Sequence, residues 1–222
     1  MLGEVLLKLS IDQILEDLKD SDPEIKRIAA KALVKHAPRP DELALSVIEQ
    51  ADRSTAMVIY DVLFDAPGDY SMVFRQGTQD PDPNVRCKAI RYLFRNKAFK
   101  ITDGVQWLKD EDPYVRRRVI SYLSWINDRA SLPPILMLAT QDHDPKVRKD
   151  ALRLIAVWGR HEHVGAVMPA LEDGEVEVRI QAAQTLKRIT GEDFGEPSCA
   201  TEDELEWIVA RWQGWWEITK DR

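Results

Sequence analysis

The sequence predicts an all-α fold, an α-solenoid (α-α superhelix) of about six helical hairpins with a tryptophan-rich capping helix at the C-terminal end. Two observations predict it: a short motif recurs about every 30 residues, and no segment shows the sustained alternation typical of a strand. One helical hairpin cannot bury its apolar face alone, but stacked hairpins can.

The recurring motif begins with aspartate and proline, followed two residues later by an apolar residue and a base. The clear copies are DPEIKRIAAKAL, DPNVRCKAIRYL, DPYVRRRVISYL and DPKVRKDALRLI, which start at Asp22, Asp82, Asp112 and Asp144. Two weaker copies are DRSTAMVIYDVL, which lacks the proline and the base, and EVEVRIQAAQTL, which start at Asp52 and Glu175. The starts at 22, 52, 82, 112, 144 and 175 lie 30 to 32 residues apart, which indicates a regular array.

Each copy of the motif predicts the start of a helix. The aspartate can accept hydrogen bonds from the first-turn N–H groups, and the proline already has a helical φ and lacks an N–H that would be unpaired. Apolar residues then recur at helical spacing, as at Val85, Ala89, Ile90 and Leu93. A first helical pattern precedes each motif, for example over residues 10–21, 40–51, 101–111, 132–142 and 164–173.

The chain is predicted to consist of a repeat array over residues 1–190, followed by a loop and a capping helix over residues 191–222. The segment TGEDFGEPSCA is rich in turn-forming residues, and Thr201 with Glu204 makes a capping box. Four of the seven tryptophans lie within residues 207–216. That helix either covers the open end of the last hairpin or docks a partner through its aromatic side chains.

The core of the motif, as in Asp82, Pro83, Val85 and Arg86, resembles the HEAT-like repeats, in particular the short bacterial class first named for phycobilisome lyases. The resemblance covers about residues 9–190 and implies a bacterial protein. It also implies a structural ladder in which each motif arginine pairs with a turn aspartate, so that Arg86, Arg116 and Arg148 face Asp52, Asp82, Asp112 or Asp144. The ladder residues are then Asp82, Arg86, Asp112, Arg116, Asp144 and Arg148.

Charge is segregated along the chain. Residues 23–36, 83–97, 113–126 and 145–160 together carry a formal charge of +15, so with −7 for the whole chain the remainder carries −22. The resemblance implies that second helices line a concave face. We therefore expect a basic concave surface that binds an acidic segment of a protein partner through Lys88, Arg91, Arg95, Arg117, Lys149 and Arg153. The alternative is a solvated face whose bases pair with the chain's own acids.

Catalytic motifs are not evident, and we expect no enzyme, no cofactor and no metal site. The pair His161 and His163 has poor ligand spacing for a helix, and the di-iron hydroxylases that resemble this repeat use several His-Glu pairs where this chain has one. No phosphate-binding glycine loop, HExxH or nucleophile elbow occurs. Cys87 lies between two bases that could lower its pKa, but a half-buried small residue is the simpler interpretation.

Two other functions stay open at this stage. The resemblance allows a phycobilin lyase-like or chaperone subunit. It also allows a nucleic-acid binder similar to the DNA glycosylases built from HEAT-like helices, with Asp150 as the acid and Trp107, Trp125, Tyr92, Tyr122 or Trp158 as stacking groups. The net charge of −7 and the pI near 5.2 argue against nucleic acid.

The two cysteines lie far apart, which is typical of a reducing compartment. No apolar run reaches about 18 residues, and the N-terminal residues lack the features of a signal peptide. We therefore expect a cytoplasmic monomer without a membrane segment.

Overall fold

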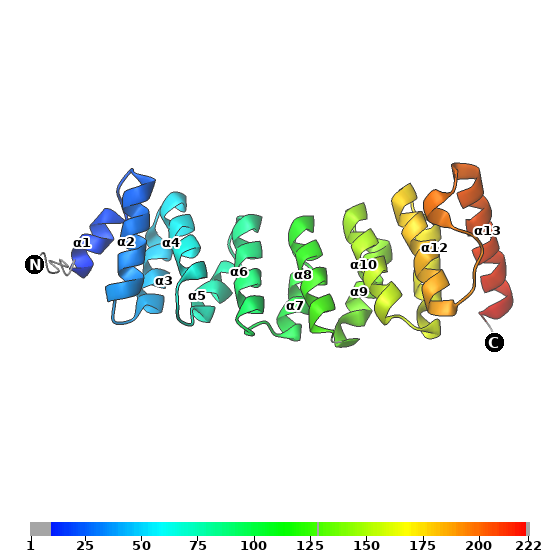
Figure 1. The fold of residues 1–222 in the computed structure, drawn as a ribbon, viewed down its shortest axis with the longest axis horizontal. Helices are drawn as coiled ribbons and strands as arrows, with labels where there is room; N and C mark the ends of the chain where they lie inside the picture. Colours follow the sequence, from blue (N-terminus) through cyan, green and yellow to red (C-terminus); the bar gives the residue numbers. More distant parts are fainter. Residues whose placement is uncertain (1–9, 128, 221–222) are drawn as a thin grey trace, which may run out of the picture. The chain divides into compact units, whose positions relative to one another are not determined.

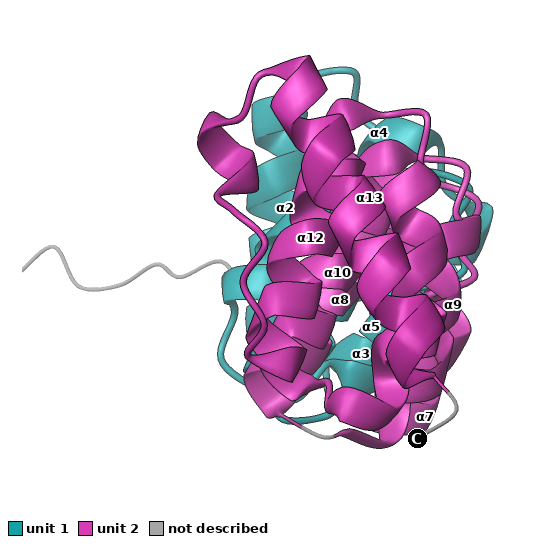
Figure 2. Cartoon of the chain, turned by 90° about the vertical axis from the view of Figure 1, so that its right-hand side faces the viewer, with its two compact units in different colours: residues 1–99 teal, residues 100–222 magenta. Residues whose placement is uncertain are grey.

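The computed structural model describes residues 10–127 and 129–220. The chain divides into two compact units, residues 1–99 and 100–222 (Figure 2). Within the described residues every regular element is a helix, which confirms the all-α α-solenoid class. The predicted boundary between array and cap, at residue 190, lies inside the second unit.

The first unit contains three helical hairpins. Their helices are α1 (Ile11–Asp17) with α2 (Pro23–His36), α3 (Pro40–Gln50) with α4 (Arg53–Asp65), and α5 (Ser71–Gly77) with α6 (Pro83–Arg95). In Figure 1 the second helices α2, α4 and α6 stand in front of the first helices α3 and α5. The second helix of each hairpin thus packs beside the second helix of the next, as α2 does against α4.

The second unit contains three further hairpins and a final helix. The helices are α7 (Ile101–Trp107) with α8 (Pro113–Ile126), α9 (Leu132–Gln141) with α10 (Pro145–Trp158), α11 (Val164–Val167) with α12 (Val176–Thr190), and α13 (Glu202–Thr219). Short 3-10 helices cover Arg129–Ser131, His161–His163, Met168–Glu172 and Pro197–Cys199. In Figures 1 and 2, α8, α10 and α12 lie on one side of this unit, and α7 and α9 lie on the other.

The six second helices of the described residues begin directly after the predicted motif starts, and at five of them the motif aspartate is the N-cap and its side chain accepts a first-turn N–H. The Asp82 carboxylate accepts from the Asn84 N–H at 2.8 Å, and Asp52 accepts from the Thr55 N–H at 2.8 Å although no proline follows it. Glu175 at the weakest copy makes no side-chain cap bond. The need for an N-cap explains why an aspartate recurs at the start of the second helices.

The apolar positions of the motif form the core between first and second helices. Val85, Ala89, Ile90 and Leu93 are each at most 1% exposed. Burying a large aliphatic side chain contributes roughly 1.5–3 kcal/mol, so six such stripes hold the hairpins together.

The last helix packs one face against the array and leaves the other in solvent. Leu205, Ile208 and Trp212 of α13 are buried, and Trp212 meets the Phe194 ring edge-on with centroids 4.7 Å apart. Thr201 and Glu204 make the predicted capping box. Trp207, by contrast, is 55% exposed. Across residues 10–127 and 129–220, no helix has both the length and the apolar character needed to cross a membrane.

Candidate functional site

The turns between first and second helices carry paired aspartates two residues apart. The first aspartate of a pair accepts the N–H of the second: Asp80 from Asp82 at 2.8 Å, and Asp142 from Asp144 at 2.9 Å. The second aspartate caps the helix that follows. The first carboxylate therefore keeps an oxygen for a neighbouring repeat. The second carboxylate caps its own helix, and that of Asp82 also pairs with Arg53 of the neighbouring repeat.

The motif arginine clamps its own turn. Arg116 Nη1 donates to the carbonyl oxygens of Asp110 and Glu111, at 2.7 and 3.0 Å. Arg86, Arg148 and Arg179 make the same pair of contacts to the residues six and five positions earlier. The repetition shows that the motif arginine closes the turn in front of its own helix.

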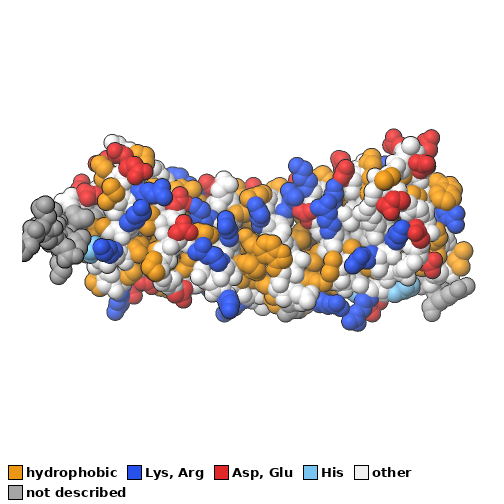
Figure 3. All heavy atoms as spheres, in the orientation of Figure 1, with side chains coloured by type: hydrophobic (Ala, Val, Ile, Leu, Met, Phe, Trp, Pro, Cys, Tyr) orange, Lys and Arg blue, Asp and Glu red, His pale blue; other side chains and the backbone are white. Residues whose placement is uncertain are grey.

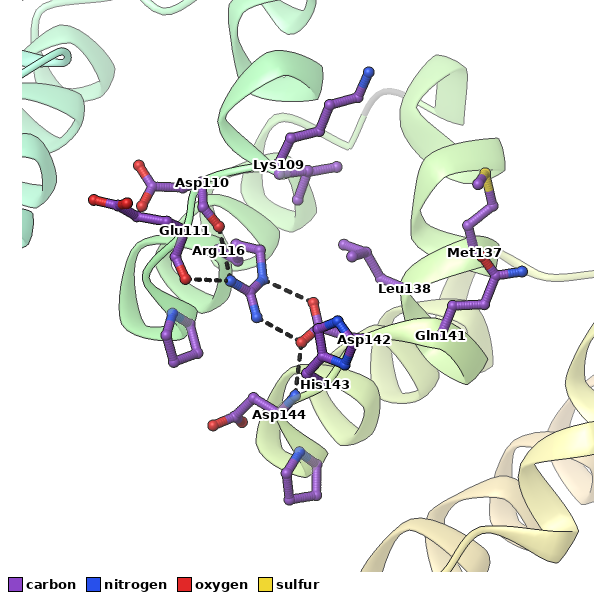
Figure 4. Close-up of a pocket in the computed structure, with 13 residues that line it drawn as sticks. Lys109, Asp110, Glu111, Arg116, Met137, Leu138, Gln141, Asp142, His143 and Asp144 are labelled. Atoms are coloured by element: carbon purple, nitrogen blue, oxygen red, sulfur yellow. Dashed lines mark hydrogen bonds and ion pairs between the residues drawn. The ribbon is translucent and has the colours of Figure 1, made fainter.

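The remaining guanidinium donors reach the next turn. Arg116 donates from Nε and Nη2 to Asp142, at 2.7 and 2.6 Å, and its partner carboxylate is only 3% exposed (Figure 4). Arg148 makes the same bidentate contact with Asp173, at 2.6 and 2.7 Å. These charge-assisted forks join successive turns.

The partners of Arg116 and Arg148 correct the prediction from sequence. The expected acids were Asp52, Asp82, Asp112 or Asp144, but the carboxylates that accept are Asp142 and Asp173. Asp112 and Asp144 instead cap α8 and α10. Asp82 does pair, but with Arg53 of α4 at 2.6 Å.

A groove opens beside the Arg116–Asp142 pair, with a volume of about 670 Å³ (Figure 4). Its apolar lining comes from Leu108, Met137 and Leu138. A similar groove of about 350 Å³, lined by Leu18 and Val47 among others, lies at the corresponding turns of the first unit. Because the groove recurs with the repeat, it follows from the stacking of hairpins rather than from a dedicated ligand site.

In each unit, the surface formed by its second helices is here called the second-helix face. In the first unit its predicted bases are Lys88, Arg91 and Arg95 of α6. Lys88 pairs with Asp61 of α4, and Arg95 lies 3.7 Å from Asp65 and 4.3 Å from the centroid of the Phe64 ring. Arg91 lies over the same ring at 5.3 Å.

In the second unit the predicted bases of this face also meet acids. Arg117 of α8 pairs with Asp150 of α10 at 2.7 Å, and Arg153 lies 3.3 Å from the same carboxylate. Lys149 pairs with Glu177 of α12. Figure 3 shows acidic and hydrophobic side chains among the lysines and arginines of this view. The bases are therefore interleaved with acids rather than gathered in an uninterrupted patch.

Comparison with known proteins identifies the repeat. The family model described as HEAT repeats matches residues 71–151 and 132–201, which together cover more than half of the chain. The chain belongs to the HEAT-repeat family. A search of solved structures finds a crystal structure of an engineered protein with 18% identity and a TM-score of 0.42, covering 92% of this chain and 95% of that one. No curated protein matches the chain.

HEAT repeats are a protein-interaction and scaffolding fold. On its second-helix face this HEAT-repeat protein carries further cations that the sequence prediction did not include. Arg27, Lys31 and Lys35 of α2 line a groove of about 410 Å³ opposite Asp61 and Asp65 of α4. They lie 5, 9 and 13 residues after the cap Asp22. Lys149, Arg153 and Arg95 occupy the same register positions in their own repeats, so register could have found the α2 residues.

The HEAT turns contain a second sequence signal besides the Asp-Pro motif. An aspartate stands two residues before the cap at Asp20, Asp80, Asp110 and Asp142. At the repeat that lacks the motif base, Arg53 of α4 reaches Asp80 and Asp82, each at 2.6 Å. The sequence could therefore have predicted these ion pairs from the Asp-x-Asp spacing and from the arginine next to the cap aspartate.

Candidate catalytic groups of this HEAT-repeat protein are already engaged. Asp150 lies between Arg117 and Arg153, and three of the five aromatic residues suggested for stacking, Tyr92, Tyr122 and Trp158, are buried. The His163 Nδ1 accepts from the Arg160 N–H at 3.0 Å. Among the described residues, no three histidine, cysteine or acidic side chains gather as a metal site.

Asp173 gives the HEAT ladder a pH dependence. Burial alone would raise its pKa, but hydrogen bonds from Arg148 and the Glu175 N–H outweigh burial and lower the pKa below its ordinary value of 3.8. Its carboxylate therefore stabilises the fold fully above about pH 4, and this contribution is lost as the pH falls through the folded-state pKa.

We predict that Asp173→Asn lowers the free energy of unfolding at pH 7, and that its difference from wild type shrinks as the pH falls below about 4. Urea unfolding at pH 7 and in the acid range measures both. A difference that stays constant across this range would show that the carboxylate charge contributes nothing.

Proposed function

We propose that this HEAT-repeat protein is a non-enzymatic binding module whose second-helix face takes an acidic segment of a protein partner. The observation that supports the proposal is a division between two kinds of ion pair. The turn pairs of Arg116 and Arg148 are buried, since the side chains of their partners Asp142 and Asp173 are 3% and 8% exposed. The pairs on the second-helix face are more exposed: the side chains of Asp65 and Glu177 are 82% and 73% exposed. The most covered of these acids, Asp150, is 19% exposed, and its partner Arg117 is 37% exposed.

This difference in exposure decides which bases a partner can use. An exposed ion pair contributes only about 0–1 kcal/mol, so a partner carboxylate can replace an internal one at little cost. A buried pair cannot be opened in this way, because removing one member strands the other charge. The available bases are therefore Lys88, Arg91, Arg95, Arg117, Lys149 and Arg153, together with Arg27, Lys31 and Lys35.

Burial of the turn pairs likewise supports a structural role for the motif arginines. We propose that Arg86, Arg116 and Arg148 serve the ladder with the turn aspartates and do not contact the partner. We further propose that the protein is a monomer that needs no cofactor and that it lies in the cytoplasm, a location that the two-cysteine composition supports. Binding to an acidic segment through exposed bases weakens as the salt concentration rises.

A charge-reversal experiment tests this function. The double variant Arg91→Glu, Lys149→Glu is expected to lose partners that the wild type captures from source lysate, because it removes two cations from the second-helix face and adds two acids. The matched control Lys19→Glu, Lys109→Glu makes the same charge change beside the turn grooves and is expected to retain them. Captured proteins are compared by mass spectrometry.

If the Arg91→Glu, Lys149→Glu variant captures the same acidic partners as wild type, the second-helix face is not the binding surface. If instead the Lys19→Glu, Lys109→Glu control loses them, the turn grooves are the binding surface.

A further inference from the structure

Two large apolar side chains of the second unit lie open on the second-helix face. Trp125 of α8 is 69% exposed and Val157 of α10 is 64% exposed. Each stands 13 residues after its cap aspartate, Asp112 or Asp144. They therefore occupy the same register position on neighbouring second helices.

The C-terminal ends of these two helices are tied together beside that row. Asn127, in the left-handed conformation at the end of α8, accepts a hydrogen bond from Trp158 Nε1 at 3.0 Å. Trp158 directly follows Val157, and Asn127 follows Trp125 by two residues. Because α8 and α10 pack against each other and packed helices have axes about 8–10 Å apart, we expect Trp125 and Val157, at the same register position, to lie side by side at about that spacing.

Basic side chains flank the row. On α10, Arg153 lies one turn before Val157 and is 57% exposed. On α12, Arg188 occupies the same register position as Trp125 and Val157 and is exposed. Arg160, just beyond α10, is exposed as well. An apolar row flanked by arginines is complementary to a ligand that combines apolar and acidic side chains.

We propose that Trp125 and Val157 dock the apolar side chains of an acidic amphipathic helix of a protein partner, while the flanking arginines bind its carboxylates. Two turns of an α-helix rise about 10.8 Å, so apolar residues seven positions apart match the spacing of the row. An exposed tryptophan is a favoured anchor in such contacts. This inference rests on the proposed function and adds the class of partner to it.

The test uses two labelled peptides of equal length and charge. One is an amphipathic helix with glutamate on one face and leucine on the other, and its matched partner has alanine in place of leucine. Fluorescence anisotropy measures the Kd for each. Wild type is expected to bind the leucine peptide at least about tenfold more tightly than the alanine peptide.

Trp125→Ala is expected to remove that preference, whereas Trp125→Phe retains most of it. Trp207→Ala, which truncates an exposed tryptophan outside this face, is the control and is expected to bind as wild type does. Val157→Asp is expected to weaken binding of the leucine peptide further, because it adds a negative charge to the row. Thermal melting verifies that each variant is folded. All three substituted side chains are more than half exposed, so we expect little change in Tm.

The outcomes separate the two proposals. Suppose that wild type binds both peptides equally and the Arg91→Glu, Lys149→Glu variant loses binding. This result would overturn the docking role of Trp125 and Val157 and would leave the proposed binding of an acidic partner intact. Failure of wild type to bind either peptide would overturn this inference, and the lysate comparison then decides the proposed function separately. A preference for leucine that survives Trp125→Ala would also overturn it.

Discussion

Replacing Arg116 by alanine is expected to lower the free energy of unfolding by about 3–5 kcal/mol. The substitution leaves the Asp142 carboxylate, which is 3% exposed, without its bidentate partner in the interior. It also frees the turn carbonyls of Asp110 and Glu111. Urea unfolding followed by circular dichroism measures the loss.

Two further variants identify the cause of that loss. Arg117→Ala removes a neighbouring base from a more exposed pair and is expected to cost less than about 1 kcal/mol. Arg116→Met combined with Asp142→Leu replaces both buried charges by apolar groups, and is expected to recover most of the stability. If Arg116→Ala costs no more than Arg117→Ala, the buried fork contributes little to the fold.

The second large effect is expected at Trp212. Trp212→Ala should destabilise the protein by about 3–5 kcal/mol, because it leaves a cavity where the indole packs between α13 and the Phe194 ring. Calorimetry should show a Tm lowered by roughly 6–20 °C. The expected loss agrees with the predicted role of residues 191–222 as a cap.

Trp207→Ala is the matched control for Trp212→Ala, since it truncates the same residue type on the opposite side of α13. Trp207 is 55% exposed and contacts the Arg211 guanidinium, so its loss should change stability by less than about 1 kcal/mol. Equal effects of the two substitutions would contradict a cap that acts through one buried face.

The fold was predictable because its signals are local and repeated. Asp82 and Pro83 define where α6 begins, and Val85 and Ile90 define which side it buries, all within one helix. The six motif starts supply the same information for every second helix. Capping and helical periodicity depend on neighbours in sequence, so sequence alone captures them.

The ion pairs were less predictable because their partners come from other repeats. Asp142 and Asp144 look equivalent in the sequence, and only the cap bond that Asp144 accepts from the Lys146 N–H leaves Asp142 as the partner of Arg116. Register within the repeat would have suggested the choice, since each such aspartate stands two residues before a cap.

The ion pairs of the second-helix face were even less predictable from the sequence. Counting charge per helix made α6 and α10 basic, but Lys88 meets Asp61 from α4 and Lys149 meets Glu177 from α12. A sum over one helix cannot reveal acids supplied by the helix beside it. Likewise, helical periodicity does not report that the Trp125 side chain is 69% exposed.

The most direct test of the account is the free energy of unfolding of the Arg91→Glu, Lys149→Glu variant. If these bases serve partner binding and the buried ion pairs serve stability, the free energy of unfolding should lie within about 1 kcal/mol of wild type. A loss as large as that of Arg116→Ala would show that the second-helix face holds the repeats together, and would contradict the division on which the proposed function depends.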